Sequence, residues 1–284
     1  MQPKTLAERM AAGGAVQELT ASTPLISANH VFRIWMPERS VVLKVYGSEA
    51  RRRREGHALD ALTRITSLPR VLDKGDEASL SWILFEDAGK WNLQSLPENP
   101  GLAHSAGAIL AEIHDSDRSA FSNLARGIDQ EWIGVDFSAT LRRLDRYRGR
   151  VGVPADIIKT ARDVNAPFAS EPTIAHTDPT TRNFIVDDDG TVTLIDWEWA
   201  TLAPPEWDLS RTTWSIGMHA GPTAAAAVFA GYGRTIDDVQ LDRWIIYHSA
   251  QTLVRIAERN LSSGPASVPP VLVDEFNRAV LGAS

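Results

Sequence analysis

The chain of 284 residues contains no cysteine. Disulfide bonds, thiolate catalysis and zinc sites built from cysteine are therefore excluded. No run of apolar residues is long enough to span a membrane, and the segment from Met1 to Val16 has no apolar core typical of a signal peptide. We therefore expect a cytoplasmic protein with no membrane partner.

Positive charge and phosphate-binding glycine motifs are also scarce. The net charge of −7 argues against a general nucleic-acid binder, so no nucleic-acid partner is expected. The loop from Thr20 to Asn29 contains no glycine, and the pattern G-x-x-x-x-G-K-[ST] occurs nowhere, which excludes a P-loop. Hydroxyl and amide groups of that loop could still contact phosphates. Apolar residues form 43% and charged residues 23% of the chain, as in a soluble globular protein.

The stretch from Ile174 to Asp196 combines a polar cluster with the pattern of a β-hairpin. Two short apolar runs flank an acidic turn that ends in Gly190, where a hairpin loop favours glycine. If the two runs pair antiparallel, the residues at their outer ends, Asn183 and Asp196, come together. Asp178 lies on the loop that leads into the first run. An amide and two carboxylates would then be held on a rigid support.

This set of groups suits phosphoryl transfer. Asp178 would orient the attacking hydroxyl and take its proton, while the oxygen atoms of Asn183 and Asp196 would hold Mg²⁺. The alternative interpretation is an ordinary surface hairpin with an acidic turn and a polar loop.

The segment from Val16 to Tyr46 is typical of three β-strands, and Lys44 interrupts the apolar run of the third. A lone lysine in a strand usually faces solvent. In a kinase-like N-lobe, however, a lysine at this place reaches the α- and β-phosphates of the nucleotide.

The segment from Glu49 to Thr63 predicts a helix with Glu55 on its apolar face. An unpaired carboxylate there would be costly, so we expect Glu55 to pair with Lys44. Glu49 is the rival partner, although its place in the first turn is explained by the helix dipole. The run from Arg51 to Arg54 is interpreted as a solvated helix face.

An apolar strand from Leu80 to Phe85 gives way to a small acidic turn, which predicts a hinge between two lobes. Backbone groups of Glu86 and Ala88 would face the adenine edge of a nucleotide. An ordinary exit from a strand is the alternative. We place the N-lobe at residues 1–87 and the C-lobe at residues 88–284.

The rest of the chain is typical of helices. The pattern predicts them from Leu102 to His114, from Leu141 to Arg150, where the helix would be basic and exposed, and from Val239 to Asn260. The segment from Phe121 to Thr140 has no clear pattern.

Together these residues resemble the aminoglycoside phosphotransferase family. The resemblance is strongest in His176 to Asn183, read as H-T-D-P-T-T-R-N, in Leu194 to Glu198, read as L-I-D-W-E, and in Pro204 to Leu209, read as P-P-E-W-D-L. It implies an α+β, bilobal kinase-like fold. The N-lobe would be an antiparallel sheet with one main helix, and a mostly helical C-lobe would carry the catalytic loop and hairpin. No long activation segment follows Asp196, so a protein substrate is not expected.

The resemblance also implies roles and cofactors. Asp178 would be the catalytic base, Lys44 would bind phosphates with Glu55 positioning it, and Asn183 and Asp196 would bind Mg²⁺. The donor would be ATP, with GTP as an alternative. Two further residues would brace the catalytic loop: His176 and Asp208. Thr177 stands where the family more commonly has glycine.

The acceptor would be a hydroxyl of a small molecule, and three functions remain open. The first is inactivation of an aminoglycoside or other antibiotic, which would need carboxylates near the site, and three could supply them: Glu198, Glu206 and Glu258. The second is a metabolic kinase for an amino alcohol, sugar or nucleoside. The third is a nucleotide-binding relative without catalysis. Further candidates to line the acceptor site are Trp199, Trp214, His219, Tyr247, His248 and Gln251.

Overall fold

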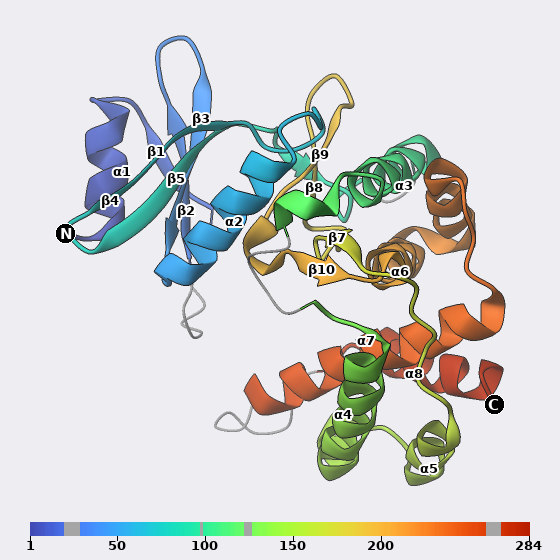
Figure 1. Cartoon of the computed structure of the whole chain (residues 1–284). Helices are drawn as coiled ribbons and strands as arrows, with labels where there is room; N and C mark the ends of the chain where they lie inside the picture. Colours follow the sequence, from blue (N-terminus) through green and yellow to red (C-terminus); the bar gives the residue numbers. More distant parts are fainter. Residues whose placement is uncertain (20–28, 97–98, 122–126, 260–267) are drawn as a thin grey trace.

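The computed structural model describes residues 1–19, 29–96, 99–121, 127–259 and 268–284 (Figure 1). A sheet-rich N-terminal part precedes a mostly helical C-terminal part. The elements follow in this order: α1 (Pro3–Ala11), β1 (Val16–Glu18), β2 (His30–Trp35), β3 (Ser40–Tyr46), α2 (Glu49–Ala61), β4 (Val71–Glu77), β5 (Leu80–Glu86), β6 (Trp91–Asn92), α3 (Pro100–His114), the 3₁₀ turn η1 (Arg118–Phe121), α4 (Gln130–Val151), α5 (Ala155–Asp163), β7 (Thr173–Ala175), β8 (Phe184–Val186), β9 (Val192–Leu194), the 3₁₀ turn η2 (Trp197–Trp199), β10 (Thr201–Ala203), α6 (Pro205–Tyr232), α7 (Asp238–Arg259) and α8 (Pro270–Gly282).

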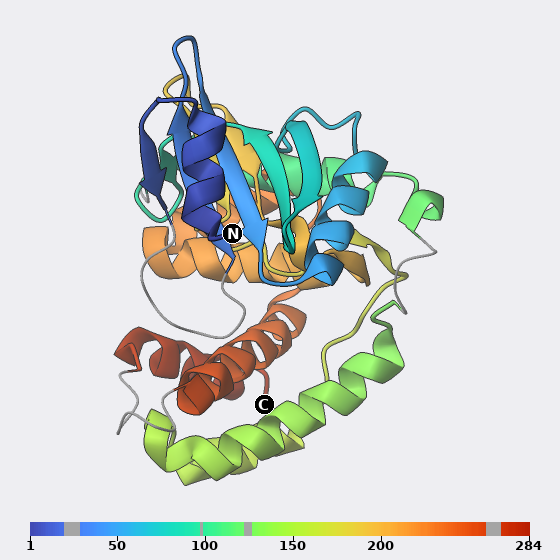
Figure 2. The ribbon, with the colours of Figure 1, turned by 90° about the vertical axis from the view of Figure 1, so that its left-hand side faces the viewer.

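The N-terminal sheet has five antiparallel strands in the order β1-β2-β3-β5-β4. Side chains alternate between its two faces. On β3, Leu43 and Val45 pack with α1 in one buried cluster, whereas Tyr46 packs with α2 in another. Lys44 therefore lies on the face that α2 covers. Figure 2 shows α1 lying along the opposite face.

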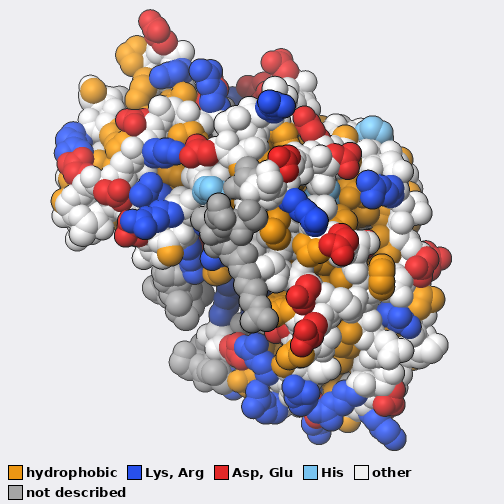
Figure 3. All heavy atoms as spheres, in the orientation of Figure 1, with side chains coloured by type: hydrophobic (Ala, Val, Ile, Leu, Met, Phe, Trp, Pro, Cys, Tyr) orange, Lys and Arg blue, Asp and Glu red, His pale blue; other side chains and the backbone are white. Residues whose placement is uncertain are grey.

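The C-terminal part contains the predicted hairpin and a helical core. The hairpin of β8 and β9 gains a third strand, β6, the long helix α3 packs beside it, and α6 packs on α3. A separate apolar core joins α4, α5, α7 and α8. Helix α6 is broken by a non-helical residue, Gly221 (φ 80°), which is followed by Pro222. Figure 3 shows Lys and Arg side chains gathered over α4 and α5, where the sequence predicts an exposed basic helix.

The predicted fold class is confirmed. The sheet, its main helix α2, the hairpin and the long helices α3 and α7 lie where the sequence places them. Two N-terminal elements, α1 and β4, were not predicted, and the segment without a clear pattern contains the first half of α4. The division into lobes after residue 87 remains a prediction. Among the described residues, no helix combines the length and hydropathy needed to cross a bilayer.

Candidate active site

The hairpin brings Asn183 and Asp196 to one place. Phe184 pairs with Leu194 in the ladder, and one step outward the N–H of Ile195 donates to the carbonyl of Asn183 at 2.8 Å. Both polar residues line the same cavity. The turn closes with Gly190 at φ 83°, as its sequence predicts. The hairpin is therefore a rigid support for two oxygen-bearing side chains.

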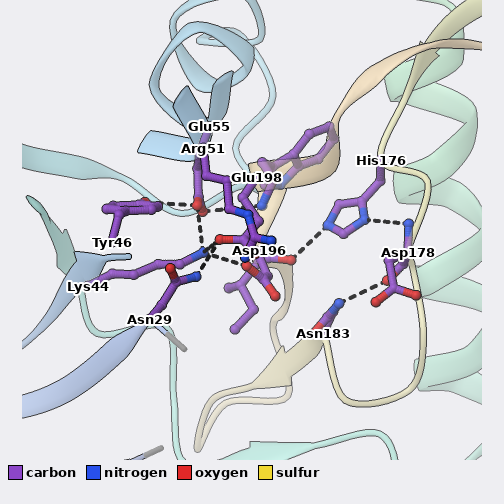
Figure 4. A network of polar contacts seen from close by, with 12 residues as sticks. Asn29, Lys44, Tyr46, Arg51, Glu55, His176, Asp178, Asn183, Asp196 and Glu198 are labelled. Atoms are coloured by element: carbon purple, nitrogen blue, oxygen red, sulfur yellow. Dashed lines mark hydrogen bonds and ion pairs between the residues drawn. The ribbon is translucent and has the colours of Figure 1, made fainter. Parts of the chain in front are cut away.

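Lys44 and Glu55 form the predicted buried pair (Figure 4). The Nζ of Lys44 lies 2.6 Å from Oε2 of Glu55, which is 1% exposed, and it also donates to the carboxylate of Asp196. Glu55 accepts two further hydrogen bonds, from the Tyr46 hydroxyl at 2.8 Å and the Trp197 N–H at 3.2 Å. Glu55 therefore accepts three hydrogen bonds, one of them from the charged lysine.

Glu198 is a second buried carboxylate beside Lys44, and the sequence did not predict its place. Its oxygens lie 3.5 Å from Nζ of Lys44 and 3.4 Å from Nη1 of Arg51, and one accepts from the Asn29 amide. Arg51 also lies 4.5 Å from the centre of the Trp199 ring. Strand β3, helix α2 and the residues after the hairpin therefore share one ionic network.

Two interpretations of α2 are resolved by these contacts. Glu49, the rival partner of Lys44, pairs instead with Arg53 at the surface, at 2.5 Å. The interpretation of the whole arginine run as a solvated face is wrong for Arg51 and Arg52, whose side chains are 25% and 14% exposed and pair with Glu198 and Asp76.

The network fixes the charges of its members. Burial alone would lower the pKa of Lys44, but the surrounding carboxylates of Glu55, Asp196 and Glu198 raise it above its ordinary value. Burial tends to raise the pKa of Asp196, yet the charge and hydrogen bond of Lys44 hold it below its ordinary value. Lys44 is therefore a permanent cation and Asp196 a permanent anion near neutral pH.

The arrangement of oxygen atoms suits a divalent cation at the hairpin. Carboxylate oxygens of Glu55, Asp196 and Glu198 lie within 4.8 Å of one another, and Lys44, which contacts all three, offsets part of their negative charge. Asn183 uses its amide nitrogen to donate to the Asp178 carbonyl at 2.8 Å, which leaves its amide oxygen available. Asp196 contacts Lys44 through Oδ1 only. One amide and one carboxylate oxygen are donors that Mg²⁺ accepts.

Asp178 is held by an arginine that the sequence analysis missed. Oδ1 of Asp178 accepts from Nε of Arg211 at 2.9 Å and from Nη2 at 2.6 Å. Oδ2 has no hydrogen bond to any of the described residues, and the side chain is 36% exposed. Asp178 therefore has one fixed oxygen and one that can accept a hydroxyl proton.

His176 braces the loop, as the resemblance implies. Its Nε2–H donates to the Ile195 carbonyl at 2.8 Å, and its Nδ1 accepts from the Asp178 N–H at 3.2 Å. A carbonyl only accepts, so these bonds specify the tautomer with its proton on Nε2. The next residue, Thr177, has φ 67°, which explains the glycine common there in the family. Its hydroxyl donates to the Trp199 carbonyl at 3.0 Å, so a specific bond accompanies the strained backbone.

Asp208 is the second brace. It is fully buried and accepts from the N–H groups of His176 at 2.7 Å and Thr177 at 2.8 Å. We expect Asp208→Ala to lower the free energy of unfolding by at least about 2 kcal/mol, because the buried N–H of His176 and the partly buried N–H of Thr177 would lose their partner. Denaturant unfolding measures this loss. Asp188→Ala removes an exposed carboxylate and serves as the control. Equal stability of the two variants would contradict the bracing role.

A cavity of about 400 Å³ opens between the sheet and the hairpin. Its wall includes the predicted hinge residues Glu86 and Ala88 together with Lys44, Asn183 and Asp196. The N–H of Glu86 already donates to the Arg70 carbonyl at 2.9 Å. The backbone of Glu86 can therefore offer a ligand in the cavity its carbonyl oxygen but not its N–H.

The hinge is fixed against the hairpin. Gly89 has φ 130°, and a Cβ there would lie 2.4 Å from the Val186 carbonyl oxygen, so only glycine fits. Arg33 of β2 adds an ion pair to Asp87 at 2.7 Å. Arg33 also lines the cavity and was not predicted. The polar loop expected to contact phosphates lies, from residue 20 to residue 28, outside the described residues.

Several candidates for the acceptor site serve the helical core instead. Tyr247 and His248 are fully buried, and Trp214 is buried beside them. His219 is bonded to the Ser215 carbonyl of its own helix. Trp214, Tyr247 and His248 are therefore packing residues, as their spacing along a helix also allows, whereas His219 is exposed.

The family comparison agrees with this geometry. A model described as "Phosphotransferase enzyme family" matches residues 26–244. The chain belongs to this family. The predicted resemblance is thereby confirmed, as is the prediction of an enzyme that transfers a phosphoryl group to a hydroxyl of a small molecule. A comparison with curated proteins by sequence found no match.

Solved structures share the fold over the whole chain. A spectinomycin phosphotransferase in complex with ADP and spectinomycin is 16% identical, with 100% of this chain and 98% of that chain covered and a TM-score of 0.67. An aminoglycoside 2′-phosphotransferase in its GDP complex is 10% identical, with coverage of 99% and 98% and a TM-score of 0.74. A choline kinase from Streptococcus pneumoniae is 15% identical, with coverage of 99% and 98% and a TM-score of 0.59. At sequence identities this low, the similarity shows only that the fold is shared.

Proposed function

We propose that the protein transfers the γ-phosphoryl group of ATP to a hydroxyl of a small molecule in a Mg²⁺-dependent reaction. One observation carries this proposal. Lys44, held extended by Glu55 at 2.6 Å, lies on the wall of the same cavity as Asn183 and Asp196. A fixed cation and two metal-compatible oxygens facing one cavity are what a nucleotide triphosphate requires.

The nucleotide would lie with its base at the hinge and its phosphates at Lys44. Backbone groups of Glu86 and Ala88 would contact the adenine edge, and the apolar wall of Val42 and Phe85 would contact its ring faces. Because one similar fold holds ADP and another holds GDP, we take ATP as the donor and GTP as the alternative.

Mg²⁺ would be held by Asn183 and Asp196, and when bound it neutralises charge on the phosphates. Lys44 adds a cation to the same phosphates. Oδ2 of Asp178 accepts the proton of the acceptor hydroxyl, while Arg211 holds Oδ1 and so fixes the direction of the carboxylate. His176 and Asp208 keep the loop in this position.

The biological role is proposed to be intracellular, in antibiotic inactivation or in metabolism. Similar folds include enzymes for spectinomycin and choline, so both roles have structural precedents. The non-catalytic alternative is disfavoured because Asp178, whose carbonyl is bonded to the cavity residue Asn183, retains a carboxylate oxygen without a hydrogen bond to a described residue.

The test is release of ADP from Mg-ATP with a panel of hydroxyl compounds, combined with calorimetric binding of Mg-ATP. The panel holds aminoglycosides, peptide antibiotics, nucleosides, choline-like amines, sugars and hydroxy acids. Turnover of one compound that is lost in Asp178→Asn supports the proposal. Binding of Mg-ATP without turnover would favour the non-catalytic alternative, and absence of binding would overturn the proposal.

A further inference from the structure

The carboxylates expected to attract a cationic acceptor are all engaged elsewhere. Glu198 belongs to the ionic network of Lys44. Glu206 accepts from the hydroxyl of Ser170 at 2.5 Å and from its N–H at 3.2 Å. Glu258 accepts from Arg143 at 2.7 and 2.8 Å. Glu198 and Glu258 are therefore paired with cations, and Glu206, whose partners are neutral, directs its carboxylate to Ser170 and not to Asp178.

The charge nearest the free oxygen of Asp178 is instead positive. Arg211 is 7% exposed, and its only hydrogen bonds to described residues run to Oδ1 of Asp178. A guanidinium has five N–H donors, so three remain for a ligand. The unused Nη1 of Arg211 is not a buried atom without a partner, so it reaches solvent, where an anionic group of a ligand can approach it.

A second arginine, Arg255, lies near Arg211 and is not paired with a carboxylate of the described residues. Arg255 of α7 reaches solvent and makes no ion pair with a described residue. The two cations lie near each other, because His248, two turns before Arg255 on the same face of α7, bonds to Ser210, the neighbour of Arg211, at 3.0 Å. Burial lowers the pKa of Arg255, and the charge of Arg211 lowers it further. The carboxylate on the neighbouring helix, Asp136, keeps its charge but accepts from Tyr247 at 2.5 Å and Gln251 at 3.3 Å, and it makes no ion pair with Arg255.

The charges around Asp178 indicate which charge the acceptor carries. Arg211 binds the carboxylate of Asp178, which the reacting hydroxyl needs, and Arg255 adds a second positive charge near this pair. A polycation would meet repulsion here, whereas an anion would satisfy the unused donors. We propose that the acceptor carries a carboxylate or phosphate group near the hydroxyl that is phosphorylated, and that Arg211 and Arg255 bind this anionic group. The proposal rests on the proposed function, whose acceptor class it names.

The first arm of the test measures binding without turnover. Protein loaded with Mg-ADP is titrated by calorimetry with glycerate, with glycerol 3-phosphate and with kanamycin, a polycation. We expect at least one of the two anions to bind and kanamycin not to bind. The identity of the anion that binds separates a carboxylate from a phosphate acceptor.

The variants assign that binding to the arginines. Arg255→Gln should lower the affinity for the anion at least about tenfold, equivalent to about 1.4 kcal/mol. Arg255→Lys should retain most of that affinity. The matched control is Arg39→Gln, which removes an exposed arginine at the tip of the β2–β3 turn and should change nothing. The inference would be overturned if kanamycin bound or if neither anion bound. It would also be overturned if Arg255→Gln bound the anion as tightly as the wild type does.

The second arm measures ADP release from Mg-ATP with the same compounds. Turnover of an anion, with KM raised about tenfold and kcat changed less than about threefold in Arg255→Gln, supports both proposals. Anion binding without ADP release would contradict the proposed function and leave the anion site in place. Phosphorylation of kanamycin would support the proposed function and overturn the anionic acceptor.

Discussion

Asp178→Asn is expected to slow phosphoryl transfer by at least about a thousandfold, within the range attributed to positioned acid–base groups. The variant keeps an oxygen for Arg211 but cannot take the hydroxyl proton. Its affinity for Mg-ATP should remain within about twofold of the wild-type value, because Asp178 acts on the acceptor. Steady-state kinetics and calorimetric titration with Mg-ATP measure the two quantities on the same preparation.

The control for this variant is Asp188→Asn, which removes one negative charge from the exposed hairpin turn near Lys90. It should retain wild-type turnover. A thermal melt shows whether Asp178→Asn is folded. If the folded variant turned over at the wild-type rate, Asp178 would have no part in the chemistry.

Asp196→Asn is expected to abolish the dependence of nucleotide affinity on Mg²⁺. In the wild type, ATP should bind at least about tenfold more tightly with Mg²⁺ than with a chelator, since even outer partners of a metal affect its affinity by about 10–100-fold. In the variant the two affinities should agree. Lys44 keeps Glu55 and Glu198 as partners, so the phosphate-binding cation remains in place.

Titration of ATP into both proteins, with Mg²⁺ and with a chelator, measures this difference. The variant Asp188→Asn again provides the matched loss of charge. If the ATP affinity of Asp196→Asn depended on Mg²⁺ as in the wild type, the hairpin would not be the metal site. The carboxylates around Lys44 would then be the alternative site.

Local patterns were sufficient to predict the parts of the site that lie on single elements. The hairpin follows from two apolar runs around a turn with Gly190, and the outer ends of its strands must then meet. The Lys44–Glu55 pair follows from the cost of a carboxylate on the apolar face of a helix. In both cases the physical reason is contained in a few neighbouring residues.

Contacts between distant elements were not predictable in this way. Arg211 follows Asp178 by a whole hairpin and part of α6, and nothing in its local sequence shows which face of the helix meets the loop. The same holds for Glu198, which the fold draws to Lys44, and for Arg255. Their positions depend on how the elements pack, which periodicity does not specify.

Two missed elements have different explanations. Strand β4 is rich in charged residues and lies at the sheet edge, so it lacks the apolar alternation of a strand. Helix α4 had usable signals: Asp129 caps its first turn by accepting from the Trp132 N–H at 2.8 Å, and Gly152 ends it at φ 78°. Those two residues bracket the helix and could have shown its full extent.

The most direct test of the account follows the phosphoryl group itself. ATP labelled at the γ-phosphate is incubated with the wild type, Mg²⁺ and an acceptor with which the enzyme releases ADP. The label is then measured in ATP, in inorganic phosphate and in the organic product. We predict labelled organic phosphate that requires Mg²⁺ and is absent with Asp178→Asn. Label found only in inorganic phosphate, or an organic product formed equally by Asp178→Asn, would contradict phosphoryl transfer at this site.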